Sequence, residues 1–215
     1  MDSVDYLGEA FYDEARKMLA ERLTEFRFLH SVSVSDTAAE MARAYGVNVA
    51  EARLAGLVHD WDKNFTDEEL FSRVRAYGIV LPEHSEDMGP LLHPLTGAET
   101  LRRTFPGMPE TILQAVSRHT SGAIDMTDLD IIVYVSDMIE PLRTKGKLKA
   151  IRQEVGKVSL EELFAHAYYL TIEHLVSRRR FIHPDSIEVW NRYVAEARDV
   201  IGVVRDTDGN LILQS

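Results

Sequence analysis

The chain has 215 residues, of which 45% are hydrophobic and 27% are charged, as is usual for a soluble globular protein. The 35 acidic residues outnumber the 24 lysines and arginines, and the net charge of −11 argues against broad nucleic-acid binding, which needs a basic face. Because the chain has no cysteine, disulfides, thiolate metal sites and cysteine nucleophiles are excluded.

The first clear helical pattern lies upstream of a His-Asp dipeptide. Apolar residues three and four apart between Val32 and Ala42 predict one helix, and Gly46 is a typical residue to end it. Asn48 is a good N-cap for a second helix, which runs as far as His59-Asp60. These signals predict two helices joined by a short turn.

Further helices follow along the chain. Thr66 opens a capping-box pattern for a third helix, and residues 82–90 are expected to form a loop. Pro94 suits the first turn of the next helix and places His93 just outside it. Another helix leads up to His119. The β-branched run at residues 131–135 fits either a strand or a buried helix, and the helical surroundings favour a helix that ends before residue 141.

The end of the chain has two distinct patterns. Two more helices are predicted, at about residues 159–177 and 184–200. Residues 201–215 are different, because two short apolar runs flank a glycine turn and predict a small β-hairpin. No repeat or linker divides the sequence. We therefore predict one all-α domain over residues 1–215, a helical bundle with a hairpin-like tail.

Histidines and aspartates are candidate metal ligands on several of these segments. His30 and His59 lie at roughly equal distances from the Gly46 turn, along helical paths of about 24 and 20 Å. An antiparallel helix pair would therefore bring His59, with Asp60 beside it, back to the level of His30. Imidazole and carboxylate ligands suit iron, manganese or zinc. Spacing alone leaves open whether these side chains bind a metal or serve packing.

An ordered series of short motifs carries a family resemblance over about residues 27–193. The matching stretches are residues 27–30 (RFLH), 55–63 (AGLVHDWDK), 91–98 (LLHPLTGA), 115–122 (AVSRHTSG), 136–143 (SDMIEPLR) and 181–184 (FIHP). The sequence resembles HD-domain metal-dependent phosphohydrolases and, among them, the YqeK family of symmetrical diadenosine tetraphosphate hydrolases. One departure is Pro94, which stands where this family commonly has glycine after the histidine.

The resemblance implies a role for each matched residue. The metal ligands would be His30, His59, Asp60 and Asp137. His93 and His119 would hold a second metal or face the phosphates, and with Asp60 they are the expected catalytic residues. The phosphate-binding residues would be Arg27, Lys63, Thr120, Gly122 and Arg143, besides the two histidines. The family implies a divalent metal, with iron expected and manganese or zinc also compatible, and a nucleotide substrate that yields ADP.

Other functions remain open at this point. The chain could be an HD phosphohydrolase that acts on another nucleotide or phosphoester, or a metal-dependent nucleotide sensor without turnover. Asp62 is a candidate for a role behind the ligands or in proton handling, and Trp61 could stack on an adenine or serve packing. The acidic N-terminus lacks a signal-peptide pattern, and no apolar run reaches the roughly 18 residues of a membrane span. We expect a cytoplasmic protein without nucleic-acid or membrane partners, and a homodimer is left open.

Overall fold

The protein folds into a bundle of helices, seen here in a computed structural model that describes residues 4–81, 88–89, 91–144, 146–195, 203–205 and 211–213. The helices are α1 (Glu9–Arg22), α2 (Glu25–Tyr45), α3 (Val49–Val58), α4 (Asp67–Tyr77), α5 (Leu92–Thr104), α6 (Glu110–Arg118), α7 (Asp128–Ile139), α8 (Gly146–Glu154), α9 (Leu160–Ser177), α10 (Pro184–Val189) and the π-helix η2 (Trp190–Ala195). The strands β1 (Val203–Arg205) and β2 (Leu211–Leu213) pair antiparallel, with Val203 opposite Leu213. The predicted all-α class is therefore confirmed.

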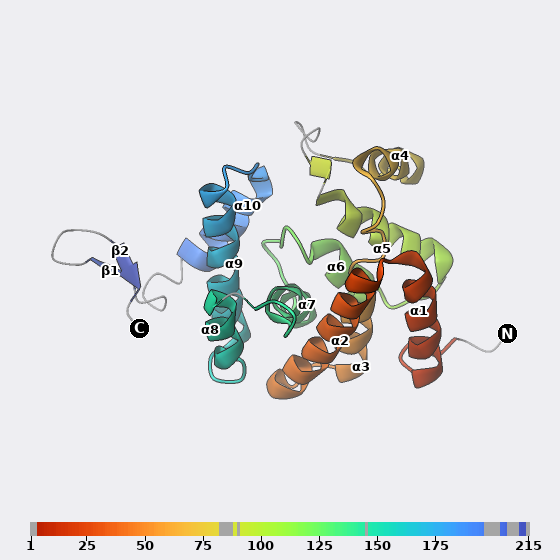
Figure 1. The fold of residues 1–215 in the computed structure, drawn as a ribbon, viewed down its shortest axis with the longest axis horizontal. Helices are drawn as coiled ribbons and strands as arrows, with labels where there is room; N and C mark the ends of the chain where they lie inside the picture. The colour runs from red at the N-terminus through yellow and green to blue at the C-terminus, as the bar shows by residue number, and fades with distance from the viewer. Residues whose placement is uncertain are drawn as a thin grey trace.

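Helix α7 occupies the middle of the bundle. It contacts α2, α3, α6, α8 and α9, and Figure 1 shows it end-on between the α2–α3 pair and the α8–α9 pair. Every residue from Leu129 to Ser136 is buried, because neighbouring helices cover α7 on several sides. This position explains the continuous apolar run at residues 131–135, which is a buried helix and not a strand.

The α2–α3 pair forms as its sequence signals predict. The Thr24 side chain caps α2, and Gly46 ends this helix in the left-handed conformation with φ of 73°. The Asn48 side chain accepts hydrogen bonds from two backbone N–H groups at the start of α3. The two helices pack along their lengths, so that the end of α3 returns to the level of the first turns of α2.

Three details differ from the sequence prediction. Helices α1 and α8 were not predicted. His93 lies inside the first turn of α5 and not just outside it, because the helix begins at Leu92. The last predicted helix, 184–200, is shorter and irregular: α10 gives way to η2 at Trp190, and residues 196–200 lie outside the described part of the chain. Among the described helices, none is long and apolar enough to cross a membrane.

Candidate metal centre

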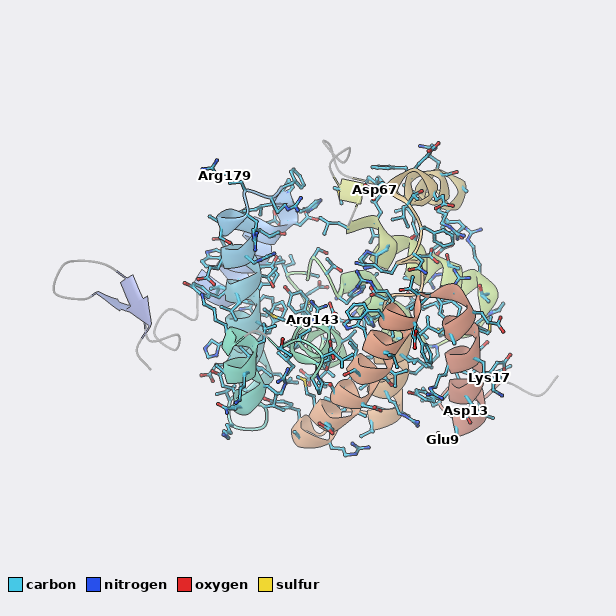
Figure 2. All side chains as sticks on the ribbon, in the orientation of Figure 1. Glu9, Asp13, Lys17, Asp67, Arg143 and Arg179 are labelled. Carbon is cyan, nitrogen blue, oxygen red and sulfur yellow. The ribbon has the colours of Figure 1, made fainter. Side chains whose placement is uncertain are left out.

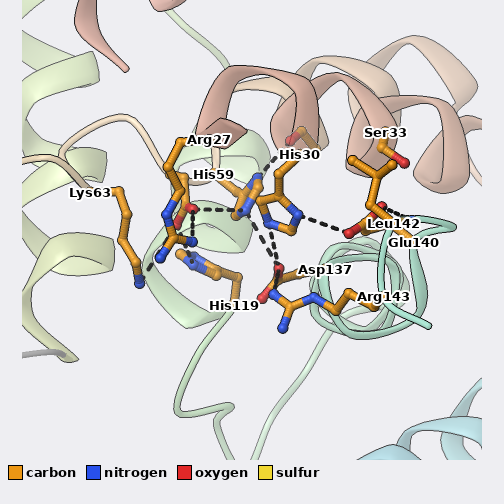
Figure 3. A network of polar contacts seen from close by, with 12 residues as sticks. Arg27, His30, Ser33, His59, Lys63, His119, Asp137, Glu140, Leu142 and Arg143 are labelled. Carbon is orange, nitrogen blue, oxygen red and sulfur yellow. Dashed lines mark hydrogen bonds and ion pairs between the residues drawn. The ribbon is translucent and has the colours of Figure 1, made fainter. Parts of the chain in front are cut away.

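Six candidate ligands from five different segments of the bundle converge at one place. They are His30 on α2, His59 and Asp60 directly after α3, His93 on α5, His119 directly after α6 and Asp137 on α7. All except Asp137 are buried, and Figure 3 shows several of them turned toward one another between α2 and α7. The predicted convergence of His30 with His59 is confirmed by a distance of 5.3 Å between their ring centroids.

Among the described residues, the candidate ligands form three overlapping groups, two of which share Asp60. The first contains His30, His59 and Asp60, the second contains Asp60, His93 and His119, and the third contains His59, His119 and Asp137. Asp60 Oδ2 lies 3.6 Å from His59 Nε2, whereas Asp60 Oδ1 lies 3.2 Å from His93 Nε2 and 3.7 Å from His119 Nε2. Because its two oxygens face different histidines, Asp60 has the geometry of a carboxylate that could bridge two metal ions.

Asp137 approaches the two histidines of the first group from the side of α7. Its Oδ1 lies 2.9 Å from His30 Nε2 and 3.8 Å from His59 Nε2. Together with Asp60, it gives a set of two imidazoles and two carboxylates. Nitrogen and oxygen ligands of this kind fit iron, manganese or zinc.

Two of the histidines are oriented by the backbone of their own helices. Nδ1 of His59 donates to the carbonyl of Gly56, and Nδ1 of His119 donates to the carbonyl of Val116, both at 2.7 Å. A proton held on Nδ1 leaves the lone pair of Nε2 directed into the centre.

Buried nitrogen atoms without hydrogen bonds indicate how the cluster fits a metal. His30 Nε2 and His59 Nε2 are both inaccessible to solvent and make no hydrogen bond within the described part of the chain. The short distance from His30 Nε2 to Asp137 therefore lacks hydrogen-bond geometry. A buried polar atom without a partner is costly, and a metal ion would satisfy both nitrogen atoms.

Burial sets the ionisation of the ligands. It lowers the pKa of His59 and of His93 to about 4, so both imidazoles are neutral at pH 7, as metal binding requires. Burial opposes ionisation of Asp60, but the neighbouring histidines and Lys63 outweigh it and hold its pKa well below the usual range. The pKa of His30 is raised. Burial alone would lower it, but the contacts of His30 with Asp137 and with a further carboxylate outweigh burial.

Three cationic side chains approach the cluster. Arg27 Nη1 lies 3.5 Å from Asp60 Oδ2, Lys63 Nζ lies 3.1 Å from His93 Nε2, and Arg143 Nη2 lies 2.7 Å from Asp137 Oδ1. Figure 3 shows Arg27 and Lys63 on one side of the cluster and Arg143 on the other. Although this protein is acidic overall, it has a local group of cations at the point where the candidate metal ligands meet.

A cavity of about 420 Å³ opens beside the cluster, between α7, α8 and α9. Its lining includes the ligands His119 and Asp137, and Figure 2 shows Arg143, another lining residue, near the middle of the molecule. Thr120 lines this cavity and also a smaller hollow of about 190 Å³ on the side of α10. A ligand in the larger cavity would thus lie directly beside the candidate metal ligands.

Gly122 differs from the other predicted phosphate-binding residues in its surroundings. It adopts φ of 70°, and a Cβ added there would lie 3.3 Å from both Phe164 and Tyr168. Its backbone N–H donates to the carbonyl of Arg118. These contacts give Gly122 a packing role, and its contact with phosphate stays a prediction.

The residues that follow Asp60 contribute to packing and support. Trp61 is buried, with its ring against Phe105, so it packs in the core and does not offer a stacking surface. Asp62 is fully buried and turns away from the cluster, where it accepts hydrogen bonds from Arg22 and Thr100. These contacts favour a supporting role for Asp62, and its role stays a prediction.

Sequence reasoning missed one residue at the cluster, Glu140. Its Oε1 accepts a hydrogen bond from His30 Nδ1 at 3.1 Å. The available signal was its spacing, because a residue three positions after Asp137 lies on the same face of a helix.

Comparisons with known proteins identify the family of the chain. Residues 27–142 match the HD domain family. The symmetrical bis(5'-nucleosyl)-tetraphosphatase of Bacillus subtilis is 31% identical over 184 residues, which cover 85% of this chain and 97% of the relative. The protein of the same name from Halalkalibacterium halodurans is 29% identical, and the match covers 86% of this chain and 98% of that protein.

A solved structure supports the assignment to the HD family. It is described as a predicted HD superfamily hydrolase involved in NAD metabolism from Clostridium acetobutylicum, and it is 30% identical with a TM-score of 0.81. The match covers 86% of this chain and 97% of that structure. Taken with the cluster around His59-Asp60, these matches show that the chain belongs to the HD domain family, where it groups with the proteins named symmetrical bis(5'-nucleosyl)-tetraphosphatase.

Proposed function

We propose that this protein is a metal-dependent hydrolase that cleaves diadenosine tetraphosphate symmetrically into two molecules of ADP. The observation that carries the proposal is the convergence of six ligand-type side chains around Asp60, with three cations directly beside them. The relatives named for this activity match nearly their whole length to this chain, which supports the same substrate.

The ligand set determines what a bound metal would contribute. The metal would be held by His30, His59, Asp60 and Asp137, and a second one by Asp60, His93 and His119. A divalent metal in this position supplies a bound water of lowered pKa and a Lewis acid for a phosphate oxygen. Iron is the metal that we expect, and manganese or zinc would fit the same nitrogen and oxygen ligands.

The cations would orient and neutralise the tetraphosphate chain. Arg27 and Arg143 keep part of their side chains exposed, so each can turn from its carboxylate partner toward a phosphate. Lys63 lies deeper, and burial lowers its pKa. In symmetrical cleavage, water oxygen bonds to the β-phosphorus of one half. The bond from that phosphorus to the bridging oxygen breaks, and the other half leaves as ADP. Charge on the departing oxygen is the charge that nearby cations would stabilise.

The cavity between α7, α8 and α9 supports a nucleotide as the substrate. Its volume of about 420 Å³ lies within the usual range for small-molecule sites. Tyr134 and Leu170 give it apolar walls, and Thr120 and Thr171 add hydroxyl groups. One nucleoside half could therefore enter the cavity while its phosphates reach the metal ligands.

The two intermediate histidines favour binding over proton donation. A general acid has to carry a proton at the working pH, and the pKa of about 4 for His93 leaves it neutral. His119 has its Nδ1 engaged by the Val116 carbonyl and directs Nε2 inward. We therefore assign both first to metal or phosphate contact. A cytoplasmic location and the lack of nucleic-acid partners stay predictions, and a homodimer stays open.

Activity on a substrate panel tests the proposal. Protein loaded with Fe²⁺, Mn²⁺ or Zn²⁺ is incubated with diadenosine tetraphosphate, nucleoside monophosphates and a simple phosphodiester, before and after removal of the metal with a chelator. We expect metal-dependent turnover of diadenosine tetraphosphate. A clear preference for a monophosphate would assign another HD activity, and tight binding of the nucleotide without turnover under all three metals would identify a sensor.

A further inference from the structure

Glu140 is a buried carboxylate behind the metal ligand His30. It is only 1% exposed and caps the C-terminal end of α7. Its two oxygens have different partners: Oε1 accepts from His30 Nδ1 at 3.1 Å, and Oε2 accepts from the backbone N–H of Leu142 at 2.7 Å. Figure 3 shows Glu140 and Asp137 at different nitrogen atoms of the His30 ring.

His30 differs from the other oriented histidines in the group that receives its Nδ1 proton. His59 and His119 donate to carbonyl oxygens three residues earlier on their own helices. His30 instead donates to a side chain from α7, 110 residues away. Its orientation therefore depends on how α7 and the turn after it are placed, and not on α2 alone.

We propose that Glu140 is a positioning residue for the metal centre, which fixes the proton of His30 on Nδ1 and couples this ligand to the backbone turn that carries Arg143. A carboxylate that receives the Nδ1 proton orients a metal-binding imidazole and increases the basicity of Nε2. Nε2 of His30 is one of the two ligand nitrogen atoms that are buried without a hydrogen bond in the described part of the chain.

The turn after α7 is held in a way that supports this coupling. Glu140 binds the N–H of Leu142, the residue directly before Arg143, and Arg143 in turn reaches Asp137 at 2.7 Å. From α8, the Arg152 guanidinium donates to the carbonyl oxygens of Ile139, Glu140 and Arg143. Glu140 and Arg152 thus hold this turn from two sides. The metal ligand His30 and the cation Arg143 are therefore both positioned by the same turn.

Other roles for Glu140 fit the geometry less well. The ring of His30 separates it from the cluster, and it belongs to none of the groups of side chains that could hold a metal together. A helix cap alone would need only the contact with Leu142 and would not place the second oxygen on an imidazole. The inference rests on the proposed metal centre, but it does not depend on which nucleotide is cleaved.

Metal affinity of Glu140→Gln tests the role. A glutamine has the same shape, but its amide nitrogen would face one of the two N–H donors, so both contacts can survive only if the His30 proton moves from Nδ1 to Nε2. We expect Mn²⁺ affinity, measured by competition with a chelator, to fall about 10-fold or more. The matched control is Glu154→Gln, which alters another carboxylate–histidine pair, Glu154 with His166, away from the centre.

The proton position on His30 gives a second readout. In metal-free wild-type protein at alkaline pH, nitrogen NMR should place the proton on Nδ1, and Glu140→Gln should lose this preference. Wild-type metal affinity in Glu140→Gln, or a wild-type proton on Nε2, would overturn the proposal. Because neither measurement uses a nucleotide, a wrong substrate assignment would leave both results unchanged.

Discussion

Asp62 gives the clearest test of the support behind the ligands. It follows Asp60 by two residues, and its side chain is fully buried. Arg22 from the end of α1 donates to Oδ1 at 3.0 Å, and Thr100 of α5 donates to Oδ2 at 2.8 Å. Asp62 therefore joins the segment after α3 to two other helices. We predict that Asp62→Ala destabilises the protein and weakens the metal centre indirectly.

The expected loss of stability follows from these contacts. Removing one member of a buried ion pair costs about 3–5 kcal/mol. The Arg22 side chain is 29% exposed and can regain water, so the cost should be near the lower end, at about 3 kcal/mol. For a chain of this length, each kcal/mol shifts the melting temperature by about 2–4 °C, which gives a total shift of roughly 6–12 °C.

Thermal unfolding of metal-free protein measures this shift directly. Asp13→Ala is the control, because Asp13 is an exposed carboxylate on α1, labelled at the edge of the molecule in Figure 2. We expect the control to melt as wild type does. An Asp62→Ala protein with wild-type stability and metal content but without turnover would refute the structural role and indicate proton handling by Asp62.

Three further predictions address the centre itself. Asp60→Asn should lose most of its bound metal in elemental analysis, because two of the three candidate ligand groups share this carboxylate; retained metal and activity would show that the site is wrong. Lys63→Ala should lower kcat/KM for diadenosine tetraphosphate about 10- to 100-fold with its metal retained, and unchanged kinetics would remove Lys63 from the phosphate site. Metal-free protein should lose stability as the pH falls from about 6.5 to about 4. In the folded protein, burial lowers the pKa of His59 and of His93 to about 4, so both stay unprotonated over this range. The same histidines bind protons in the unfolded chain, and this favours unfolding. The loss of stability should reach about 3 kcal/mol for each of the two histidines. The raised pKa of His30 acts in the opposite direction. A melting temperature that stays constant between these pH values would contradict the prediction.

Local signals in the sequence were sufficient for one half of the site. The convergence of His30 and His59 follows from helix rise and from the turn at Gly46, because two antiparallel helices of similar length need only those quantities. The confirmed α7 helix likewise follows from its capping pattern at Thr127 and its helical neighbours. In these cases, contacts close in the sequence determine the geometry.

The remainder of the site depends on packing between distant helices. The positions of His93 and His119 relative to Asp60 depend on how α5 and α6 pack onto the α2–α3 pair, and sequence periodicity does not specify such crossing angles. Their grouping with Asp60 came from the family resemblance. The spacing of Glu140 from Asp137 indicates a shared helix face, but it does not identify His30 as the partner, since a glutamate before proline at a helix end is ordinarily exposed. Its burial against His30 arises only when α7 docks on α2.

The most direct test of the account is the identity of the products from diadenosine tetraphosphate. Metal-loaded protein is incubated with this substrate, and the nucleotides are separated by ion-exchange chromatography at early times. The account predicts ADP as the sole product and no turnover once the metal is removed. ATP and AMP in equal amounts would contradict symmetrical cleavage.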